Sequence, residues 1–286
     1  MTPRGIDLPA AGPTRRERYE ADQRRRSTII AAASTVVVLA AAAILIPQIP
    51  GWPDVRAAFF DGPSLRASVP DMVRAFWFDI QIFVWSAPCI LGVGLLIAVA
   101  RGVRAPALYP VRLFATLYTD VVRGVPLILW IYLIGFGIPG LIRNRTWVNP
   151  TLWGTVTLVV VYSAYVAEVF RAGIESIHES QRAAARSLGL SNTQTMRHVI
   201  LPQAVRRVIP PLMNDLVSLQ KDVALVSILG PFEALRQAET FKGKYANFTS
   251  YVVAAVLWLL ISIPLTRVTD LLLDRERRRM TGTAVR

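Results

Sequence analysis

Charged side chains occur inside apolar stretches of this 286-residue chain, where they could contact a polar solute. Lys221 and Asp222 are adjacent within residues 203–230, so on a helix they would point about 100° apart and would not pair with each other. A charge at the centre of a membrane costs about 2.5–3.5 kcal/mol on insertion scales. The segment is therefore expected to start at the cytoplasmic interface and to turn its polar face into a bundle or cavity. Lys221 and Asp222 then either line or brace that cavity, or form ion pairs with a neighbouring helix.

Two further pairs of opposite charge have the i, i+3 spacing of neighbours on a helix surface. Glu168 and Arg171 stand near the end of one apolar stretch, and Asp120 and Arg123 stand near the start of another. This spacing favours a local structural ion pair in both cases. Arg123 has a second open interpretation, because its guanidinium could instead attract the carboxylate of a solute.

The composition is that of an integral membrane protein, with 53% hydrophobic residues and a mean hydropathy of +0.42. The formal net charge is +13, and the basic residues gather between apolar runs and at both ends of the chain. This distribution is typical of cytoplasmic loops and tails that face anionic lipid, rather than of nucleic-acid binding. One cysteine, Cys89, and two histidines provide neither an internal disulfide nor a metal-ligand cluster. The sequence has no Walker A motif, so the chain is not expected to bind ATP by that route.

Six stretches of this sequence are expected to span a membrane, which predicts an all-α membrane protein. The arginine-rich segments then fall on one side, which places both termini in the cytoplasm. The expected spans are residues 27–46, 76–100, a part of 113–138, 151–170, 203–230 and 248–273. Residues 1–26 are expected to be a disordered cytoplasmic tail and residues 274–286 a second cytoplasmic tail. Residues 47–75 contain Gly-Trp-Pro and Gly-Pro turn signals and are expected to form an extracytoplasmic loop, with a surface helix near residues 69–76. Residues 124–126 are expected to break the third span early.

A polar stretch, residues 175–202, separates the fourth and fifth expected spans. Its alanine-rich run ends at Gly189, where a left-handed residue would terminate a helix. Ser191 and Gln194 have the spacing of a capping box at the start of a second helix, and Pro202 either stops that helix or begins the next segment. The pattern predicts a helix–turn–helix that presents small and apolar side chains on the cytoplasmic side. Such a surface suits the docking of a soluble partner.

The same stretch resembles the cytoplasmic coupling loop of ABC importer permeases, whose pattern is E-A-A, three residues, G, nine residues, I-x-L-P. Ala183-Ala184-Ala185, Gly189, Val199 and Leu201-Pro202 fall on that spacing. Ala183 stands in place of the Glu and Val199 in place of the Ile, and the missing Glu removes one possible salt bridge to the partner. The alternative interpretation is an ordinary amphipathic loop between membrane helices.

A narrower resemblance, to the polar amino-acid subgroup of these permeases, covers roughly residues 76–273. It rests on RGVPL at 123–127, RAGI at 171–174, LQKD at 219–222 and LVS at 225–227. The resemblance implies a type I ABC importer permease fold, with a five-helix core in residues 76–273. Residues 27–46 would be one extra N-terminal transmembrane helix.

The resemblance also implies a function and a set of partners. The chain would be the permease subunit of an ATP-driven importer of a polar amino acid in the cell membrane, and not an enzyme. Its long tail and added first helix resemble actinobacterial glutamate permeases, which favours glutamate or glutamine. A pair of cytoplasmic ATPase subunits would carry ATP and Mg. A second permease subunit, identical or homologous, and an extracytoplasmic solute-binding protein would complete the set.

Two groups of residues would carry this function. The ATPase-coupling residues would be Ala183, Ala184, Ala185, Ser187, Leu188, Gly189, Leu190 and Pro202. The substrate-pathway residues would be Arg123, Lys221, Asp222 and Ser227. The alternative function is that of a stand-alone secondary transporter or channel, which would use the intramembrane Asp and Lys as ion or proton sites. Such a protein would have no use for the coupling loop, and a purely structural scaffold would gain nothing from burying so many charges.

Overall fold

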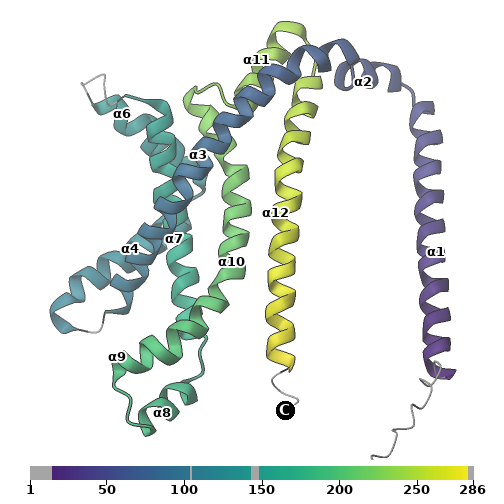
Figure 1. Ribbon diagram of the computed structural model, residues 1–286. Coiled ribbons are helices and arrows are strands. Elements are labelled where there is room, and N and C mark those ends of the chain that lie inside the picture. Colours follow the sequence, from purple (N-terminus) through teal and green to yellow (C-terminus); the bar gives the residue numbers. More distant parts are fainter. Residues whose placement is uncertain (1–14, 104, 143–147, 283–286) are drawn as a thin grey trace, which may run out of the picture. The chain divides into compact units, whose positions relative to one another are not determined.

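The computed structural model describes residues 15–103, 105–142 and 148–282, and the regular secondary structure within them is helical (Figure 1). The α-helices are α1 (Arg15–Leu45), α2 (Trp52–Phe59), α3 (Gly62–Gly102), α4 (Tyr109–Gly124), α5 (Leu127–Trp130), α6 (Ile138–Leu141), α7 (Pro150–Glu175), α8 (Glu179–Ser187), α9 (Asn192–Thr195), α10 (Leu201–Asp222), α11 (Ala234–Tyr245) and α12 (Thr249–Gly282). Tighter or wider helical segments connect several of them: η3 (Ile131–Gly137), η5 (Met196–Ile200) and η6 (Val223–Leu229). The chain divides into two compact units, residues 1–57 and residues 58–286.

Helix α1 dominates the described part of the first unit, and its described side chains are almost all exposed. The helix begins at Arg15, so the prediction of a disordered tail up to residue 26 is wrong for residues 15–26. Arginine, glutamate and alanine form helices well, and here they extend the helix of the apolar run that follows them. Residues 1–14 of that predicted tail lie outside the described residues.

The loop expected at residues 47–75 is also largely helical. It contains α2, and α3 begins at Gly62 rather than at residue 76. Asp61 caps α3 by accepting a hydrogen bond from the Ser64 amide at 2.9 Å, and Pro63 occupies the first turn, where its missing amide hydrogen costs little. The Gly-Pro signal, interpreted as a turn, marks the start of a helix instead.

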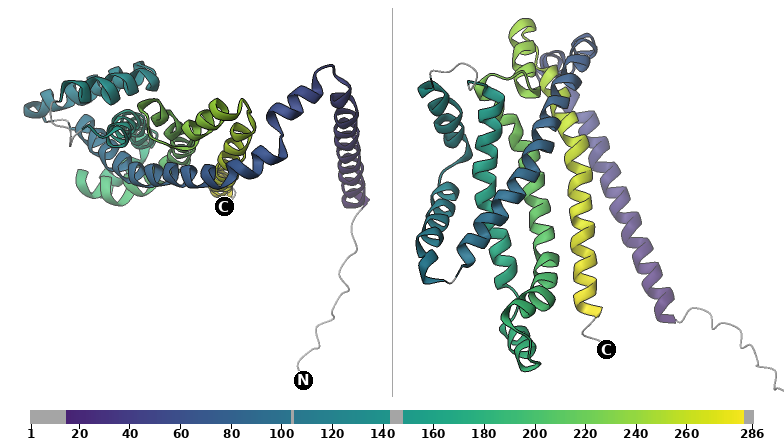
Figure 2. Two further views of the ribbon diagram at one scale, coloured as in Figure 1. Left: turned by 90° about the horizontal axis from the view of Figure 1, so that it is seen from above. Right: turned by 60° about the vertical axis from the view of Figure 1, so that its left-hand side comes forward.

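Four helical segments of the described residues are long and apolar enough to cross a membrane, and they lie in α1, α2–α3, α7 and α12. Residues 106–124 and 127–141 form a fifth candidate that bends by 109° between its two halves, which confirms the predicted break at residues 124–126. Helix α10 is too polar to meet the same criterion, yet it packs against α7 and α12 (Figure 2). The expected six spans therefore require both the bent pair and α10.

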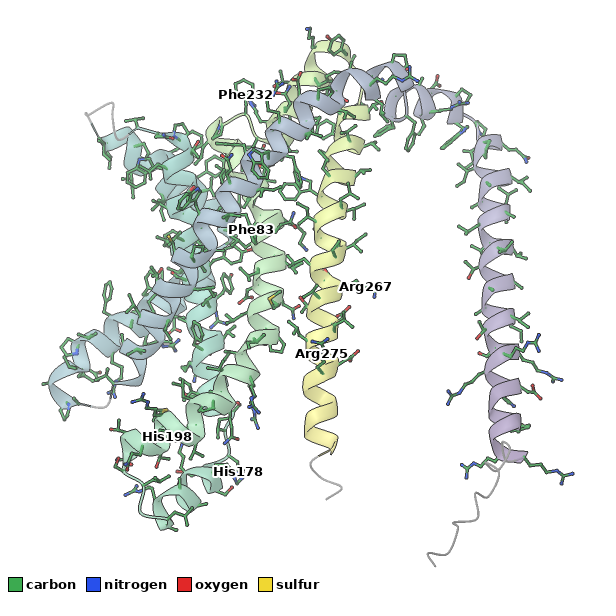
Figure 3. The ribbon with its side chains drawn as sticks, in the orientation of Figure 1. Phe83, His178, His198, Phe232, Arg267 and Arg275 are labelled. Atoms are coloured by element: carbon green, nitrogen blue, oxygen red, sulfur yellow. The ribbon has the colours of Figure 1, made fainter. Side chains whose placement is uncertain are left out.

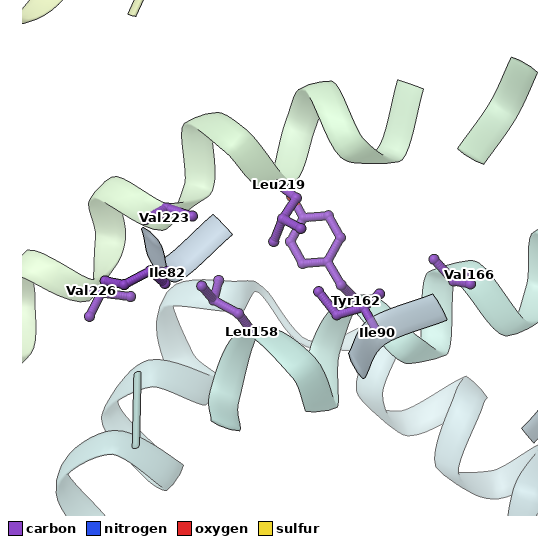
Figure 4. Close-up of a cluster of buried hydrophobic side chains, with 8 residues drawn as sticks. All are labelled: Ile82, Ile90, Leu158, Tyr162, Val166, Leu219, Val223 and Val226. Carbon is purple, nitrogen blue, oxygen red and sulfur yellow. The ribbon is translucent and has the colours of Figure 1, made fainter. Parts of the chain in front are cut away.

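The largest core cluster lies between α3, α7, α10 and η6 (Figure 4). Its buried side chains are Ile82, Ile90, Leu158, Tyr162, Val166, Leu219, Val223 and Val226. In a membrane such contacts stabilise the helices through van der Waals packing, because lipid tails are as apolar as these side chains. The cluster therefore fixes how α7 and α10 lie against α3.

Glycine residues allow α7 to approach its neighbours closely. A Cβ atom on Gly94 of α3 would lie 2.6 Å from Cγ1 of Val166, and one on Gly173 of α7 would lie 2.1 Å from Cγ1 of Val208 in α10. Both distances are far below van der Waals contact, so only glycine fits without a shift of the facing helix. Such small residues are common where membrane helices pack tightly.

Replacing Gly173 with alanine is expected to lower the stability of the full-length protein by about 1–3 kcal/mol, because the new methyl group collides with a stiff valine. The melting temperature of the purified chain in detergent measures the effect. Gly92→Ala is the matched control, since a Cβ atom there meets no atom within 4 Å. An equal loss in both variants would contradict the close packing of α7 on α10.

Candidate coupling surface and solute path

The polar stretch folds as two helices joined by a turn, α8 and α9. Helix α8 ends in a Schellman motif, in which the Leu190 amide donates to the Ala185 carbonyl at 3.2 Å and the Gly189 amide donates to the Arg186 carbonyl at 2.9 Å. Gly189 has a φ of +82°, the left-handed conformation that glycine adopts without strain. These two hydrogen bonds and the left-handed Gly189 therefore fix the conformation of the turn between the two helices.

Helix α9 begins with a capping box. The Gln194 amide donates to Ser191 Oγ at 3.2 Å, and the Ser191 amide donates to Gln194 Oε1 at 2.9 Å. The helix then continues through η5, a π-helical segment, and enters α10 at Leu201, directly before Pro202, without a break. Proline lacks an amide hydrogen and crowds the preceding turn, and a wider π turn relieves that conflict. Of the two predicted roles, Pro202 therefore has the second: it begins the next segment.

The residues predicted to couple to an ATPase differ in their exposure. Ala183, Ala184, Ser187, Leu188, Gly189 and Pro202 are exposed, whereas Leu190 is half-buried and Ala185 is buried. Leu188 stands at the turn with 83% of its surface exposed. Within residues 58–286, α8 and α9 occupy the end opposite α11, and His178, which precedes α8, and His198 of η5 mark that end (Figures 1 and 3). The turn thus offers small and apolar side chains to a partner at one end of this unit.

An apolar cluster fastens this turn to the helices on either side of it. The cluster consists of the buried residues Ile177, Ile200 and Ala204, with Ile174 and Val199 packed against them. Arg207 of α10 also donates a hydrogen bond to the carbonyl of Ser176, which follows α7. Because these contacts join the ends of α7 and α10 to the turn between them, a displacement of α8 and α9 would move both long helices.

Glu168 of α7 forms ion pairs with arginines from three helices. Arg101 at the end of α3 donates to its carboxylate at 2.8 Å, Arg123 at the end of α4 lies 3.6 Å from it, and Arg171 pairs with it along α7. The predicted Glu168–Arg171 pair is confirmed. The predicted Asp120–Arg123 pair is wrong, because α4 packs on α7 and brings Arg123 to Glu168, while Asp120 is exposed.

The predicted substrate-pathway residues lie in separate surroundings within the described chain. Arg123 contacts Glu168, as above, and Asp222 Oδ2 accepts a hydrogen bond from the Tyr162 hydroxyl at 2.7 Å. Lys221 is exposed, and Ser227 is buried in η6. The structure therefore links Asp222 to α7 and does not gather the predicted residues into one contact cluster.

Asp215 was not among the predicted site residues, although it stands in the same polar segment. Its Oδ2 atom is buried and has no hydrogen-bond partner in the described part of the chain. Its electrostatic partner is Arg123, whose guanidinium also lies over the ring of Tyr165 at 5.7 Å from the centroid. The i, i+7 spacing of Asp215 and Asp222, which places them on one face of α10, was visible in the sequence. The sequence did not show that α4 brings Arg123 to this face.

Sequence comparison relates the chain to bacterial transport proteins. Residues 91–280 match the family described as "Binding-protein-dependent transport system inner membrane component". The glutamine transport system permease protein GlnP of Escherichia coli (strain K12) is 31% identical over 222 residues, which cover 77% of this chain and 98% of that relative. The glutamate transport system permease protein GluC of Corynebacterium efficiens is 33% identical over 207 residues, which cover 68% of this chain and 90% of that relative.

Comparison with solved structures gives a consistent result. A chain from the structure titled "Crystal structure of an amino acid ABC transporter with histidines" has a TM-score of 0.69 and 30% sequence identity, and the match covers 76% of this chain and 98% of that chain. A chain from an inward-facing MetNI methionine ABC transporter has a TM-score of 0.57 at 20% identity, with 72% and 96% covered, and shows a similar fold.

Proposed function

This chain belongs to the family of binding-protein-dependent transport system inner membrane components, and from that premise we propose which solute it moves and how. It is a multi-pass membrane protein with the type I ABC importer permease fold, and it is the permease subunit of an importer whose ATPase is a separate subunit. We propose that its cargo is a polar amino acid, with glutamine and glutamate as the first candidates. Relatives named as glutamine and glutamate permeases support that choice.

The observation that carries the proposed coupling step is the capped turn between α8 and α9, which is exposed at Leu188 and fastened to α7 and α10. An ATPase subunit that holds this turn would displace α8 and α9 when it closes on ATP. The helices at either side would then tilt and change which end of the solute path is open. ATP and Mg would be bound by the partner, and the residues of this chain would transmit the motion.

Two polar groups suit a zwitterionic cargo. Arg123 is partly exposed beside Tyr165 and could hold a carboxylate through its guanidinium. Asp215 has a buried carboxylate oxygen without a hydrogen-bond partner in the described residues, and it could accept hydrogen bonds from an ammonium group. Because they come from α4 and α10, a solute that bridges them would sense the relative motion of the two helices.

An exposed polar row along α10 supports a second permease subunit as a partner. The row consists of Arg207, Asn214, Ser218 and Lys221, whose spacing places them near one face of the helix. Lipid tails would disfavour such a face, whereas a water-filled path between two permease subunits would hydrate it. We further propose that a solute-binding protein delivers the cargo at the end that carries α11, and that both termini are cytoplasmic.

Replacing Asp215 with asparagine is expected to raise the KM for the cargo about tenfold, because a charge-assisted hydrogen bond contributes about 1.5–3 kcal/mol. The measurement is ATP-dependent uptake of labelled glutamine and glutamate into membrane vesicles that contain the complete importer. Asp120→Asn is the matched control, since Asp120 is exposed on α4. Unlabelled amino acids added in excess identify the cargo by competition.

Two results would contradict parts of this proposal. An unchanged KM in Asp215→Asn would remove Asp215 from the solute path. Uptake that follows an ion gradient and ignores ATP would favour a secondary transporter instead.

A further inference from the structure

Two acidic side chains are buried together where α3 meets the start of α11. Asp79 of α3 is 2% exposed, and Glu233, which precedes α11, is fully buried. Apolar side chains surround this place, among them Phe76 of α3 and Ala234 of α11, which belong to one buried cluster. Water therefore has little access to either carboxyl group, and their charges would be poorly screened.

The hydrogen bonds of the two carboxyl groups are unequal. Glu233 caps α11, since its oxygens accept the Leu235 amide at 2.9 Å and the Arg236 amide at 2.7 Å. Asp79 accepts one bond, from the Ala234 amide to Oδ2 at 3.2 Å. Its second oxygen, Oδ1, is buried without a hydrogen-bond partner among the described residues.

The arginines nearest to this place along α3 and α11 pair with other side chains, and Lys242 and Lys244 of α11 lie over aromatic rings. On α3, Arg74 pairs with Asp71 at 3.3 Å, and on α11, Arg236 pairs with Glu239 at 3.2 Å. On α12, the titratable group nearest the start of the helix is the hydroxyl of Tyr251, which interacts with Glu239. In the described structure Asp79 interacts with Glu233 and the Ala234 amide, so no basic side chain is seen to neutralise the pair.

Two carboxylates in contact within an apolar site cannot both be ionised at low cost, so such pairs hold a proton. The amide bonds and the N-terminal end of α11 favour the ionised form of Glu233. We propose that Asp79 is a neutral carboxylic acid whose Oδ1–H donates a hydrogen bond to the carboxylate of Glu233, and that this bond holds α11 against α3. It would supply the partner that Asp79 Oδ1 otherwise lacks.

The position of α11 matters because it borders a cleft of about 580 Å³ at this end of the unit. Its lining includes Trp77 of α3 and, from either side of Glu233, Phe232 and Gln237. Phe232 is 65% exposed and marks this end in Figure 3. Loss of the Asp79–Glu233 bond is therefore expected to loosen the wall of the cleft.

The pair should also make stability depend on pH. Burial raises the pKa of Glu233 from 4.5 to about 7, against the opposing effect of the two amide hydrogen bonds. The two carboxyl groups share one proton, so this titration belongs to the pair, and the proton can reside on Asp79. Because the folded pair holds the proton more tightly than the unfolded chain does, the resulting stability is complete below about pH 4.5 and is lost as the pH rises through about 7. Alkaline solution is thus expected to weaken the contact between α3 and α11.

Infrared spectroscopy of the full-length protein in detergent tests the proposal directly. With isotope-labelled aspartate, the carbonyl band of a protonated aspartic acid is expected at neutral pH, measured in an Asp215→Asn background because Asp215 Oδ2 is also buried without a hydrogen-bond partner among the described residues. Asp79→Asn should abolish the band, and the matched control Asp71→Asn, an exposed aspartate on the same helix, should keep it. No such band in the parent protein, or a band that survives Asp79→Asn, would overturn the proposal.

The pH dependence of the melting temperature distinguishes a shared proton from an effect of packing alone. The asparagine amide of Asp79→Asn can donate to Glu233 at every pH, whereas Asp79→Ala cannot. The melting temperature of the parent should fall between about pH 5 and about pH 8. The melting temperature of Asp79→Asn should fall markedly less over this range, and that of Asp79→Ala should be low at every pH. Identical pH profiles for the parent and Asp79→Asn would count against the proposal. Neither experiment depends on the cargo, so the proposed transport function can fail without affecting this test.

Discussion

Replacing Gly189 with valine is expected to leave the protein in the membrane but to lower ATP-driven uptake about tenfold or more. Gly189 has a φ of +82° in the turn between α8 and α9, a conformation that costs other residues about 1–2 kcal/mol and β-branched ones more. A Cβ atom there would meet nothing within 4 Å, so the effect is one of backbone conformation and not of steric overlap. Strain in this turn would change how α8 and α9 present Leu188, and hydrolysis would continue without transport.

Gly189→Asn is the graded control, since asparagine tolerates the left-handed conformation better than valine. It should retain most of the uptake. The measurement compares uptake with ATP hydrolysis in vesicles that contain equal amounts of each variant. Normal uptake in Gly189→Val would refute the idea that this turn must move as a rigid unit.

Replacing Glu168 with glutamine is expected to destabilise the protein by about 3 kcal/mol, because it leaves the largely buried guanidinium of Arg101 without its counter-ion. Arg101, with 12% of its side chain exposed, loses its partner at 2.8 Å, and Arg123 and Arg171 lose the shared carboxylate as well. The ends of α3 and α4 should then separate from α7. A lower melting temperature in detergent, accompanied by reduced uptake, is the expected observation.

Glu175→Gln provides the comparison for Glu168. Glu175 also pairs with Arg171, but 61% of its side chain is exposed, and exposed pairs contribute about 0–1 kcal/mol. A loss of stability in Glu168→Gln no larger than that in Glu175→Gln would show that the arginines around Glu168 are neutralised in another way.

Local features of the fold followed well from the sequence. The capping box at Ser191, the helix end at Gly189 and the break before Pro126 depend on a few neighbouring residues, and the structure contains all three. The pair Glu168–Arg171 lies within one helical turn and was equally visible. In each case the backbone hydrogen bonds or the helical spacing decide the outcome without reference to distant segments.

Long-range contacts could not be predicted in the same way. Arg123 has an acidic neighbour at the favoured spacing, yet the packing of α4 on α7 directs it to Glu168. Asp79 stands in an apolar run and meets Glu233 only because α11 folds back onto α3. Polar residues at 47–75 suggested a loop, whereas α2 and the first turns of α3, which Asp61 caps, make most of it helical.

Site-specific crosslinking tests most directly whether α8 and α9 dock on a separate ATPase. Cys89 is the one cysteine of the chain, so a Cys89→Ser background allows a single cysteine to be placed by Leu188→Cys at the turn, or by Phe232→Cys at the opposite end as the matched control. Both parent side chains are well exposed. In membranes that contain the complete importer, Leu188→Cys is predicted to crosslink to a protein with a P-loop, and Phe232→Cys is predicted not to. Crosslinking of the ATPase from Phe232→Cys, or from neither position, would contradict the proposed coupling surface.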